Sequence, residues 1–574
     1  MMELLTAAQM RAIEQAAIES GEVTGLELME RAGTGVVEAI FEEWPELEMV
    51  GQEGGAEGGA APDPADPPRG ILGKMKALVL CGPGNNGGDG FVVARLLRAR
   101  GCEVEVFFFG EAASLPADAR VNFDRWSEIG TVKPLQDDVF DGWPDETSGV
   151  HIVIDALFGT GLARPFLQCR HLSRRMNSCS ELARTRDLFP RGVAVDIPSG
   201  LCADSGAWLG DDQPLDFAGL ANLTVTFHSL KPGHFLADGP ASCGKVVCTD
   251  IGLTAPSKLG SLSRNALIEM YNDNRPGRHI VSLVGGGGEP HLSAKQGPHK
   301  FSHGHALVLS GGHGRTGAAR LAARGALRIG AGLVTLGSPR SAMFENAAQL
   351  TAIMLHQIDG AHGVSELLED KRFNALCLGP GLGRGMDTQA VVIAALKARR
   401  ATVLDADALT RFERDPQVLF DLLHEDCVLT PHGGEFAILF PDLAANLAAR
   451  PQTGPAYSKV DATREAAARA GCVVLFKGAD TVIADPTGRC SVNSAQYERA
   501  APWLATAGAG DVLAGFITGL LARGLSPMAA AEVGAWLHVE CARQYGPGLI
   551  SEDLPEQLPA VLNRLEQGAR RTGL

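Results

Sequence analysis

The sequence predicts an α/β protein with two domains. Short runs of hydrophobic residues typical of strands are followed by Gly-rich or polar turns and then by stretches with helical spacing, and this alternation occurs in two separate series. The chain has 574 residues, of which 45% are hydrophobic and 70 are glycine. This length suggests two to four domains, and the glycine content favours turns around ligands in α/β folds over an all-helical fold.

Composition disfavours several classes of protein. The formal net charge of −16 makes a nucleic-acid surface improbable, and no apolar run approaches the ~18 residues of a membrane span. The twelve cysteines are scattered without a CxxC pair, and the first ten residues have no basic start. We therefore expect reduced thiols, a cytoplasmic protein, and neither membrane nor nucleic acid as a partner.

The first series begins after two helical stretches within residues 5–45 and a segment at 50–70 of Gly, Ala, Pro, Glu and Asp, which predicts a flexible insertion. A strand at 76–81 then leads into the Gly-rich segment 82–90 and a helix after it. This order starts a doubly wound sheet, with the ligand at the carboxyl end of the strand. Asn85, Asn86 and Asp89 supply oxygens as well as N–H groups, which suit a cation or a polar ligand.

Further strands of this series are expected within 102–110, 151–162, 192–201, 223–227 and 245–252. Two of them end in Asp155 and in Asp196, with Ser199 three residues later. Because parallel strands end at one edge of a sheet, convergence of these polar groups indicates a site. Residues 167–190 show no clear period and are expected to be a variable excursion.

The second series follows a Gly- and Pro-rich stretch around 255–300 and starts with a strand, a Gly-rich loop, a helix and a strand in 303–337. Further strands that end in Gly or polar residues are expected within 375–383, 401–409, 427–436 and 472–484. It ends in residues 506–515, where Gly508 and Gly510 lead into Asp511 and an apolar helix. Such a loop directs N–H groups and a helix N-terminus at an anion, and Asp511 could take a proton from an attacking hydroxyl. These features together favour phosphoryl transfer. The alternative for these ten residues is a plain helix start with glycines for close packing.

These residues resemble a known family, the bifunctional NAD(P)H-hydrate repair enzymes. The first half is similar to its epimerase domain in the motifs at 84–90, 155–161, 194–201, 224–233 and 250–252. The second half is similar to its ADP-dependent dehydratase domain, a ribokinase-like fold, in the motifs at 300–306, 317–324, 379–383, 404–409, 430–436, 477–481 and 507–515.

The resemblance implies a Rossmann-like epimerase domain over 1–255, a linker and domain entry over 256–300, and a ribokinase-like dehydratase domain over 301–574. It implies an isomerase that interconverts the R and S hydrates NADHX and NADPHX. It also implies a lyase that dehydrates the S form to NAD(P)H with ADP, releasing AMP and phosphate. A potassium ion, Mg²⁺ with the nucleotide, and a homo-oligomer are further expectations.

The same resemblance assigns residues to roles. Asp196 and Asp511 would be catalytic. The epimerase substrate would contact Asn85, Asn86, Gly87, Gly88, Asp89, Gly159, Thr160, Gly161, Leu162, Ala163, Arg164, Pro165 and Asp196, and potassium would bind Asn86, Asp155 and Ser199. The dehydratase substrate would contact Ala318, Gly381, Gly383, His432 and Asp511, and the nucleotide would contact Lys477, Gly478, Ala479, Asp480, Thr481, Gly508 and Gly510.

Two alternatives stay open at this point. The second domain could be a ribokinase-type kinase that phosphorylates a vitamin precursor and releases the ester. The first domain could be a non-catalytic ligand-binding or scaffold module, although the presence of Asp196 argues against that role.

Overall fold

The computed structural model describes residues 2–49, 74–135, 149–165, 190–210, 221–253, 280–285 and 299–572. The chain forms two compact units, each described by itself below. The first unit comprises Leu4–Asp273 and Arg450–Ser458, and the second comprises Met1–Glu3, Asn274–Ala449 and Lys459–Leu574. The predicted insertion at 50–70, nearly all of the excursion at 167–190 and most of the linker at 256–300 lie outside the described residues. The predicted boundaries of the domains stay a prediction.

The first unit contains a parallel sheet of seven strands in the order β4-β3-β2-β5-β6-β7-β8. The order reverses between β2 and β5, which is the switch point of a doubly wound sheet and the place where such sheets bind ligands. The strands are β2 (Lys76–Cys81), β3 (Glu103–Phe108), β4 (Val132–Pro134), β5 (Ile152–Ala156), β6 (Arg191–Val195), β7 (Leu223–Phe227) and β8 (Lys245–Thr249).

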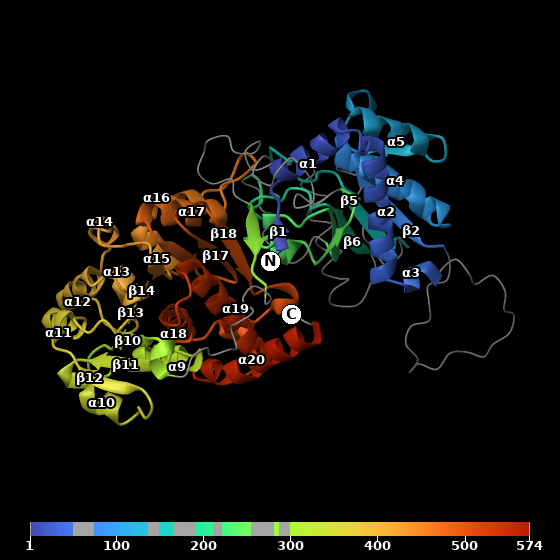
Figure 1. Ribbon diagram of the computed structural model, residues 1–574. Coiled ribbons are helices and arrows are strands. Elements are labelled where there is room, and N and C mark those ends of the chain that lie inside the picture. Colours follow the sequence, from blue (N-terminus) through green and yellow to red (C-terminus); the bar gives the residue numbers. More distant parts are fainter. Residues whose placement is uncertain are drawn as a thin grey trace, which may run out of the picture. The chain divides into compact units, whose positions relative to one another are not determined.

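The helices of this unit include α1 (Ala7–Glu19), α2 (Gly25–Glu43), α3 (Glu46–Met49), α4 (Asn85–Ala99), α5 (Ala117–Ser127) and α7 (Gly239–Ser242) (Figure 1). Capping boxes at Thr6 and Thr24 start α1 and α2. Helices α2 and α4 pack against each other, with α4 on β2, β3 and β5. A hydrophobic core of this unit buries Leu78 and Leu80, which are alternate residues of β2, together with Trp208.

The second unit is built on an 11-stranded sheet in the order β1-β9-β18-β17-β16-β15-β14-β13-β10-β11-β12. Strands β10 to β16 run in parallel, whereas β17 is antiparallel to both β16 and β18. The bounds are β1 (Met2–Leu4), β9 (Val281–Leu283), β10 (His305–Leu309), β11 (Leu333–Ser338), β12 (Met354–Gln357), β13 (Ala375–Leu378), β14 (Ala401–Leu404), β15 (Cys427–Leu429), β16 (Val473–Phe476), β17 (Asp480–Ala484) and β18 (Cys490–Ser494).

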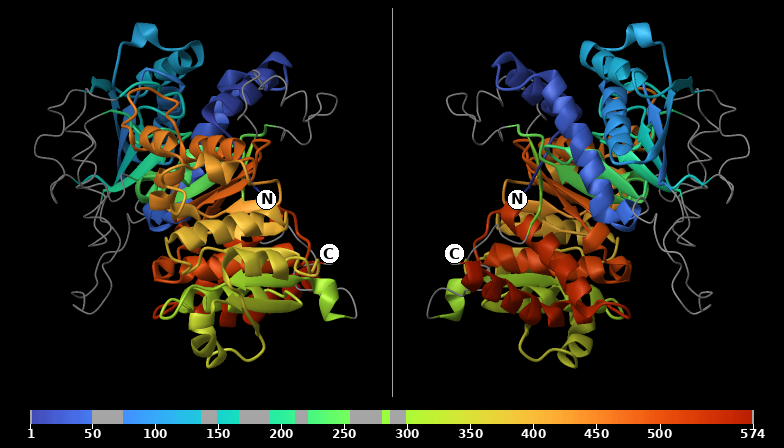
Figure 2. Two further views of the ribbon diagram at one scale, coloured as in Figure 1. Left: turned by 90° about the vertical axis from the view of Figure 1, so that its left-hand side faces the viewer. Right: turned by 90° about the vertical axis from the view of Figure 1, so that its right-hand side faces the viewer.

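Helices lie on both sides of this sheet, with α17 and α19 on opposite sides of β17 (Figures 1 and 2). The helices are α9 (Gly317–Arg328), α10 (Met343–Ala347), α11 (Gly360–Leu367), α12 (Met386–Lys397), α13 (Asp407–Thr410), α14 (Gln417–Phe420), α15 (Gly433–Leu439), α16 (Pro441–Ala448), α17 (Lys459–Ala470), α18 (Ala509–Ala522), α19 (Pro527–Tyr545) and α20 (Asp553–Thr572). Helix α18 packs closely on α9. Only glycine fits at position 515, since a Cβ there would lie 2.1 Å from the carbonyl oxygen of Ala322. This contact holds the start of α18 beside the strand ends.

The predicted fold class, a Rossmann-like doubly wound sheet and a second α/β domain, is confirmed. Two local expectations change. The segment 82–90 was expected to be a loop, but α4 begins at Asn85, so most of the segment forms its first turns. The glycines allow this, since a Cβ at Gly90 would meet Ala156 Cβ at 2.7 Å. Within 472–484 the chain forms two antiparallel strands, and Lys477–Ala479 is the turn between them.

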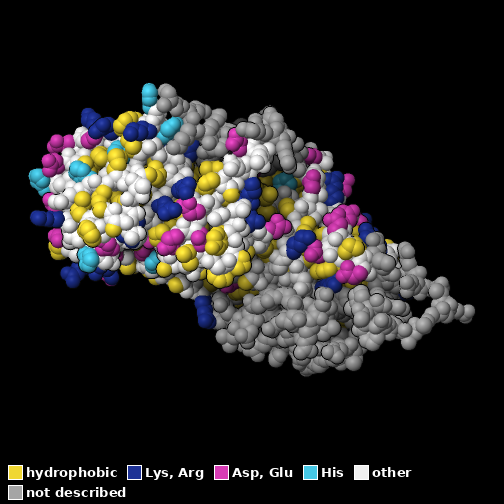
Figure 3. Space-filling view, turned by 90° about the horizontal axis from the view of Figure 1, so that it is seen from below, with side chains coloured by type: hydrophobic (Ala, Val, Ile, Leu, Met, Phe, Trp, Pro, Cys, Tyr) yellow, Lys and Arg dark blue, Asp and Glu magenta, His cyan; other side chains and the backbone are white. Residues whose placement is uncertain are grey.

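The charged side chains on the surface and the state of the cysteines agree with what the composition predicts. Figure 3 shows one face on which basic and acidic side chains are interspersed among hydrophobic ones. The ten cysteines in the described part of the chain are all free, and most are buried. Among the described helices, none combines the length and the apolar character needed to span a bilayer.

Candidate active sites

The first candidate site lies where β6 and β7 of the first unit end, and Asp196 is its centre. Asp196 follows β6 directly and has a φ of 70°. A left-handed conformation is uncommon outside glycine and is often found at functional sites. The Asp196 side chain is mostly buried, and its Oδ2 accepts a hydrogen bond from the Thr160 N–H at 3.3 Å. The strained backbone therefore turns this carboxylate toward the 159–165 turn.

Lys231 holds Asp196 in its ionised form. The Lys231 side chain is 1% exposed, and its Nζ donates to Asp196 Oδ1 (2.9 Å), Thr226 Oγ1 (2.6 Å) and the Phe227 carbonyl (3.2 Å). Thr226 Oγ1 donates to the same carboxylate oxygen at 2.7 Å. Although burial opposes ionisation, the charge and hydrogen bond of Lys231 hold the pKa of Asp196 below its ordinary value. Asp196 is therefore ionised at neutral pH, which is the form that can accept a proton.

His234 fixes the backbone of this aspartate. Its Nδ1 accepts from the Lys231 N–H at 3.1 Å, and its Nε2 lies 3.1 Å from the Asp196 carbonyl oxygen. Burial, aided by the charge of Lys231, lowers the pKa of His234 to about 4. The imidazole is therefore neutral at pH 7, with Nε2–H donating to Asp196.

The three residues expected to bind potassium meet around the start of the same turn. Ser199 Oγ donates to Asp155 Oδ1 at 2.6 Å and accepts from the Phe158 N–H at 2.8 Å. A Cβ placed on Gly159 would lie 2.6 Å from Asn86 Oδ1, and the Asn86 Nδ2 is buried without a hydrogen-bond partner among the described residues. One carboxylate with neutral oxygens suits a large monovalent cation. Within the described residues, no group of three or more His, Cys, Asp or Glu could hold a metal ion.

The other predicted epimerase residues are arranged around this centre. Gly87 and Gly88 are buried in the first turns of α4, where a Cβ at Gly87 would collide with the Gly82 carbonyl oxygen. Asn85 is exposed, and Asp89 is half-buried one turn beyond Asn86. From Gly161 to Pro165 the turn runs along the surface, and only its start contacts Asp196.

The second candidate site lies at the N-terminus of α18 in the second unit. Gly508 is the N-cap with φ 88°, and Asp511 lies in the first helical turn. Burial and the neighbouring carboxylates, Asp405 first among them, raise the pKa of Asp511 from its ordinary value of 3.8 to about 7. Because the first N–H groups of a helix have no intrahelical acceptor, this end provides donors for an anion beside a carboxyl poised near neutrality.

Lys477 faces this helix end from the turn between β16 and β17. Its Nζ donates to Asp405 Oδ1 at 2.6 Å and lies 3.6 Å from Glu435 Oε2. A Cβ placed on Gly510 would lie 3.4 Å from the same Nζ. Burial disfavours the charged amine, but Asp405 and Glu435 together raise the pKa of Lys477. A permanent cation therefore lies next to the predicted phosphate position.

Besides Asp511, the residues predicted for the dehydratase substrate come from three places: the start of α9, the loop after β13 and the N-cap of α15. A Cβ on Gly381 would lie 3.5 Å from Ala318 Cβ, and the Gly383 N–H donates to Asp407 Oδ2 at 2.8 Å. His432 caps α15: its Nδ1 accepts from the Gly434 N–H at 2.9 Å, while its side chain is 60% exposed. The exposed ring is thus held in place and accessible to a ligand.

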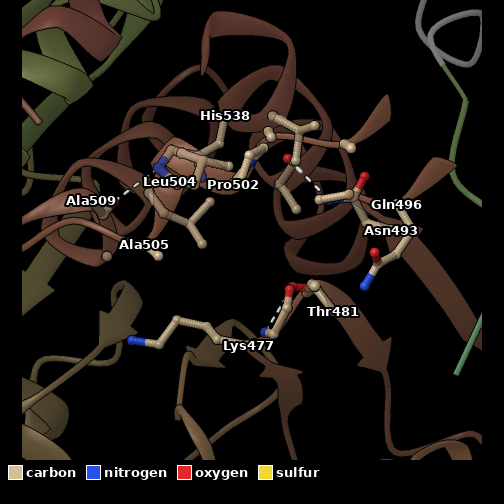
Figure 4. A pocket seen from close by; sticks show the side chains of 18 residues that line it. Lys477, Thr481, Asn493, Gln496, Pro502, Leu504, Ala505, Ala509 and His538 are labelled. Carbon is tan, nitrogen blue, oxygen red and sulfur yellow. Dashed lines mark hydrogen bonds between the residues drawn. The ribbon is translucent and has the colours of Figure 1, made fainter. Parts of the chain in front are cut away.

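A cavity of about 530 Å³ lies beside this site (Figure 4). Five predicted nucleotide residues line it: Lys477, Gly478, Ala479, Thr481 and Gly510. The apolar side chains of Leu504 and Pro502 and the polar side chains of Asn493 and Gln496 complete much of its wall (Figure 4). Its size and mixed lining suit a nucleoside.

Two predicted nucleotide residues are placed differently. The Asp480 carboxylate binds Lys459 Nζ at 2.6 Å, and Asp480 is absent from the cavity wall described above. Gly508 does not line the cavity either. A Cβ there would meet Leu321 Cδ1 at 2.7 Å, which makes glycine necessary for the N-cap.

Two α/β units, one with the buried Asp196 and one with the half-buried Asp511, define a chain with two separate sites. The sequence pattern of the NAD(P)H-hydrate dehydratase family matches residues 306–558, and that of the YjeF-related protein N-terminus matches residues 25–233. The bifunctional NAD(P)H-hydrate repair enzyme of Moorella thermoacetica is 33% identical over 99% of this chain and 98% of its own. The chain therefore belongs to the family of bifunctional NAD(P)H-hydrate repair enzymes.

Two further relatives each match one half. The NAD(P)H-hydrate epimerase of Rhodobacter capsulatus is 44% identical over 41% of this chain and 92% of its own. The solved structure of the ADP/ATP-dependent NAD(P)H-hydrate dehydratase of Bacillus subtilis, co-crystallised with ATP and Mg²⁺, is 27% identical. It covers 50% of this chain and 99% of its own, with a TM-score of 0.41.

Several residues of both sites were missed from the sequence. Lys231 lies in a motif that was recognised, but nothing in a Lys-Pro-Gly sequence indicates a buried amine. Thr226 faces the site because alternate residues of β7 point to one side. Asp405 and Glu435 also lie in recognised motifs, and a possible signal for Asp405 was its position directly after β14.

Proposed function

We propose that this protein repairs hydrated nicotinamide cofactors with two active sites. The first unit epimerises the R and S forms of NADHX and NADPHX at C6. The second unit dehydrates the S form to NADH or NADPH with the help of ADP. The observation that carries the proposal is a pair of aspartates in a chain that belongs to this family. Asp196 is buried beside Lys231, and Asp511 is half-buried at the N-terminus of α18.

In the dehydration, hydroxide is a poor leaving group and must be activated. Asp511 would accept the proton of the C6 hydroxyl as that oxygen attacks the terminal phosphate of the nucleotide. The Lys477 amine and the first N–H groups of α18 would stabilise the charge on the transferring phosphoryl group. Loss of phosphate from C6 and of a proton from C5 then restores the ring double bond, leaving AMP and phosphate.

The nucleotide would lie in the cavity lined by Lys477–Ala479, Thr481 and Gly510, with its phosphates toward the N-terminus of α18. Mg²⁺ would accompany the phosphates. Asp405, Asp407 and Glu435 give this site several carboxylates near the phosphate position, which suits an Mg²⁺-bound nucleotide. The hydrate would contact Ala318, Gly381, Gly383 and His432.

In the epimerisation, Asp196 is the acid/base group, and the hydrate would contact residues 85–89 and the 159–165 turn. Potassium would be held by Asn86, Asp155 and Ser199, where it would fix the start of that turn and satisfy oxygens that face one another. A cytoplasmic location and a homo-oligomer complete the proposal, and size-exclusion chromatography would test the latter.

The direct test is to incubate the purified protein with hydrated NADH and either ADP or ATP and to follow the absorbance of the dihydronicotinamide. The return of that absorbance, dependent on nucleotide, is expected. Accumulation of a stable phosphorylated product with no NADH would instead favour a kinase of the ribokinase type. Failure of the protein to interconvert separated R and S hydrates would show that the first unit is a binding module.

A further inference from the structure

The N-terminus of α18, where the transferring phosphate is proposed to lie, has no side-chain cap of its own. Side chains from elsewhere in the unit bind two of its backbone carbonyls instead. His538 Nε2, on α19, lies 2.9 Å from the Ala509 carbonyl oxygen (Figure 4), and Ser551 Oγ donates to the Ala507 carbonyl. The conformation of this helix start is therefore fixed by groups outside the helix.

The His538 ring is the donor in its bond to Ala509. A carbonyl oxygen accepts hydrogen bonds and cannot donate one, so Nε2 carries a hydrogen. His538 is 8% exposed, and burial lowers the pKa of its imidazole to about 4, so the ring is neutral at pH 7. Phe516 of α18 packs edge-on against the ring, with the ring centroids 6.2 Å apart. The donor is thus a neutral imidazole whose tautomer is set by the Ala509 carbonyl.

The Ala509 carbonyl belongs to the same peptide unit as the Gly510 N–H. A trans peptide is planar, and its C=O and N–H bonds point in opposite directions. A hydrogen bond that fixes the direction of the carbonyl therefore also fixes the direction of the N–H. Because Gly510 has no Cβ, sterics restrict this peptide less than most, and the bond from His538 matters more.

The Gly510 N–H is available to a ligand. Neither this N–H nor that of Asp511 has a hydrogen-bond acceptor among the described residues. Gly510 lines the cavity, and a Cβ placed on it would lie 3.4 Å from Lys477 Nζ. Unpaired N–H groups at a helix N-terminus beside a lysine amine are suited to an anion. The orientation of the 509–510 peptide therefore bears directly on the proposed phosphate position.

We propose that His538 is a positioning residue of the dehydratase, whose Nε2–H bond to the Ala509 carbonyl holds the Gly510 N–H toward the transferring phosphoryl group. The assignment rests on the proposed function of the second unit. In that step the C6 oxygen bonds to the terminal phosphorus of ADP while the bond from this phosphorus to the bridging oxygen breaks. AMP keeps the electron pair of the broken bond, and Asp511 takes the hydroxyl proton. His538 exchanges no proton and acts only through the peptide.

The test uses the full-length protein with three substitutions. His538→Gln places an amide nitrogen as many bonds from Cα as the imidazole Nε2, whereas the amide nitrogen of His538→Asn is one bond closer to Cα. His305→Asn is the matched control, because His305 is also buried, at the start of β10, with its Nε2 2.8 Å from Thr335 Oγ1. The measurements are kcat for NADH formation from pure S hydrate with ADP, the dissociation constant of AMP by calorimetry, and the melting temperature.

We expect His538→Asn to lower kcat by about 10- to 100-fold. Loss of one donor to a developing charge costs about 10²–10³-fold, and here the N–H is misdirected rather than lost. AMP, which lacks the terminal phosphate, should bind as it does to the wild type. His538→Gln should recover most of the lost activity, since its amide N–H reaches the same carbonyl. His305→Asn should lower the melting temperature and leave kcat unchanged.

A further measurement needs no loss of function. In wild-type protein with ¹⁵N-labelled histidine, the imidazole spectrum at pH 7 should show His538 with a hydrogen on Nε2 and none on Nδ1. The signal is assigned by its loss in His538→Gln. A hydrogen on Nδ1 instead would overturn the assignment, whether or not His538→Asn folds.

The kinetic outcomes are equally decisive. A His538→Asn protein with kcat within about threefold of the wild type, less than one hydrogen bond contributes, would overturn the assignment. A His538→Gln protein no more active than His538→Asn would do the same. Weaker AMP binding with an unchanged kcat would show that His538 contacts the nucleoside instead. A wild-type protein that forms no NADH from S hydrate and ADP would overturn the proposed function itself, so the two failures are distinguishable.

Discussion

The two candidate sites each contain an aspartate, buried Asp196 and half-buried Asp511, in opposite electrostatic settings. Asp196 shares its Oδ1 with the buried amine of Lys231, and its pKa lies below the ordinary value. Asp511 lies among Asp405, Asp407 and Glu435, and its pKa rises to about 7 even though Lys477 is near. The two lysines have different partners. Lys231 donates a hydrogen bond to the proposed catalytic carboxylate of Asp196 itself, whereas Lys477 donates to Asp405.

This difference suits the two reactions. A base that works without a phosphate nearby can be held ionised by a direct cation. A base beside a transferring phosphate is better left without a direct bond to the nearby lysine, because that amine then faces the phosphate. The surrounding carboxylates raise the pKa of such a base. One residue type thus has two roles because its neighbours differ.

The largest effect should come from Asp511→Asn, which keeps the size of the side chain and removes the base. We expect dehydration to fall by about 10²–10⁴-fold, with nucleotide binding and epimerisation preserved. A plain structural role for this helix start predicts instead a normal rate per folded molecule. Nucleotide binding, melting temperature and NADH formation on one sample separate the two outcomes.

Lys231→Met should affect only the first site. Loss of the amine leaves the Asp196 carboxylate buried without its cation, so the pKa of Asp196 should rise. We expect epimerisation at pH 7 to fall by roughly 10- to 100-fold and to recover partly at higher pH, because a buried carboxylate that has lost its cation binds a proton much more tightly. A pH profile of unchanged shape would mean that Lys231 does not hold Asp196 ionised. Lys245→Met, at an exposed lysine of the same unit, is the control.

Gly508→Ala should weaken the second site through the backbone. Alanine is strained at φ 88°, and its Cβ would meet Leu321 and Ser551. We expect a loss of about 1–3 kcal/mol in the stability of the loop, seen as weaker nucleotide binding by calorimetry. Gly524→Ala has a similar φ of 91° but no atom within 4 Å, so it separates strain from the clash. Equal effects of the two substitutions on nucleotide binding would contradict a local role for Gly508.

The raised pKa of Asp511 also predicts the pH dependence of stability. A carboxyl with a folded-state pKa of about 7 and an ordinary value of 3.8 binds its proton more tightly in the folded state. Its contribution to stability therefore falls as the pH rises from about 4 to 7. Asp511→Asn should melt a few degrees above the wild type at pH 8, with the difference vanishing near pH 4. A difference that does not vary with pH would show that the carboxyl is not perturbed.

The smallest effect is expected for deletion of residues 50–70. Their composition cannot build a core, and loop length has little effect on closure entropy. Both activities should persist in the shortened protein. Loss of epimerisation in a folded deletion variant, judged by intact dehydration, would show that the segment has a function.

The sequence predicted much of the fold because strands and Gly-rich turns alternate along it in a regular way. It also predicted which aspartates end strands or begin a helix, since those positions are defined locally. It could not predict that α4 starts at Asn85, because the packing of Gly90 on Ala156 is a tertiary contact. The partners Lys231 and Asp405 were likewise missed, because burial and charge pairing arise from residues far apart in the chain.

The central claim, two independent active sites in one chain, is tested most directly by complementation. Asp196→Asn, which tolerates the left-handed backbone better than alanine, should convert S hydrate but not R hydrate to NADH when ADP is present. Asp511→Asn should turn R into S hydrate without forming NADH. A mixture of the two variants should convert R hydrate to NADH at a rate near that of the wild type, measured above the uncatalysed epimerisation. A mixture that forms no NADH from R hydrate, or an Asp196→Asn protein that alone consumes it normally, would contradict the account.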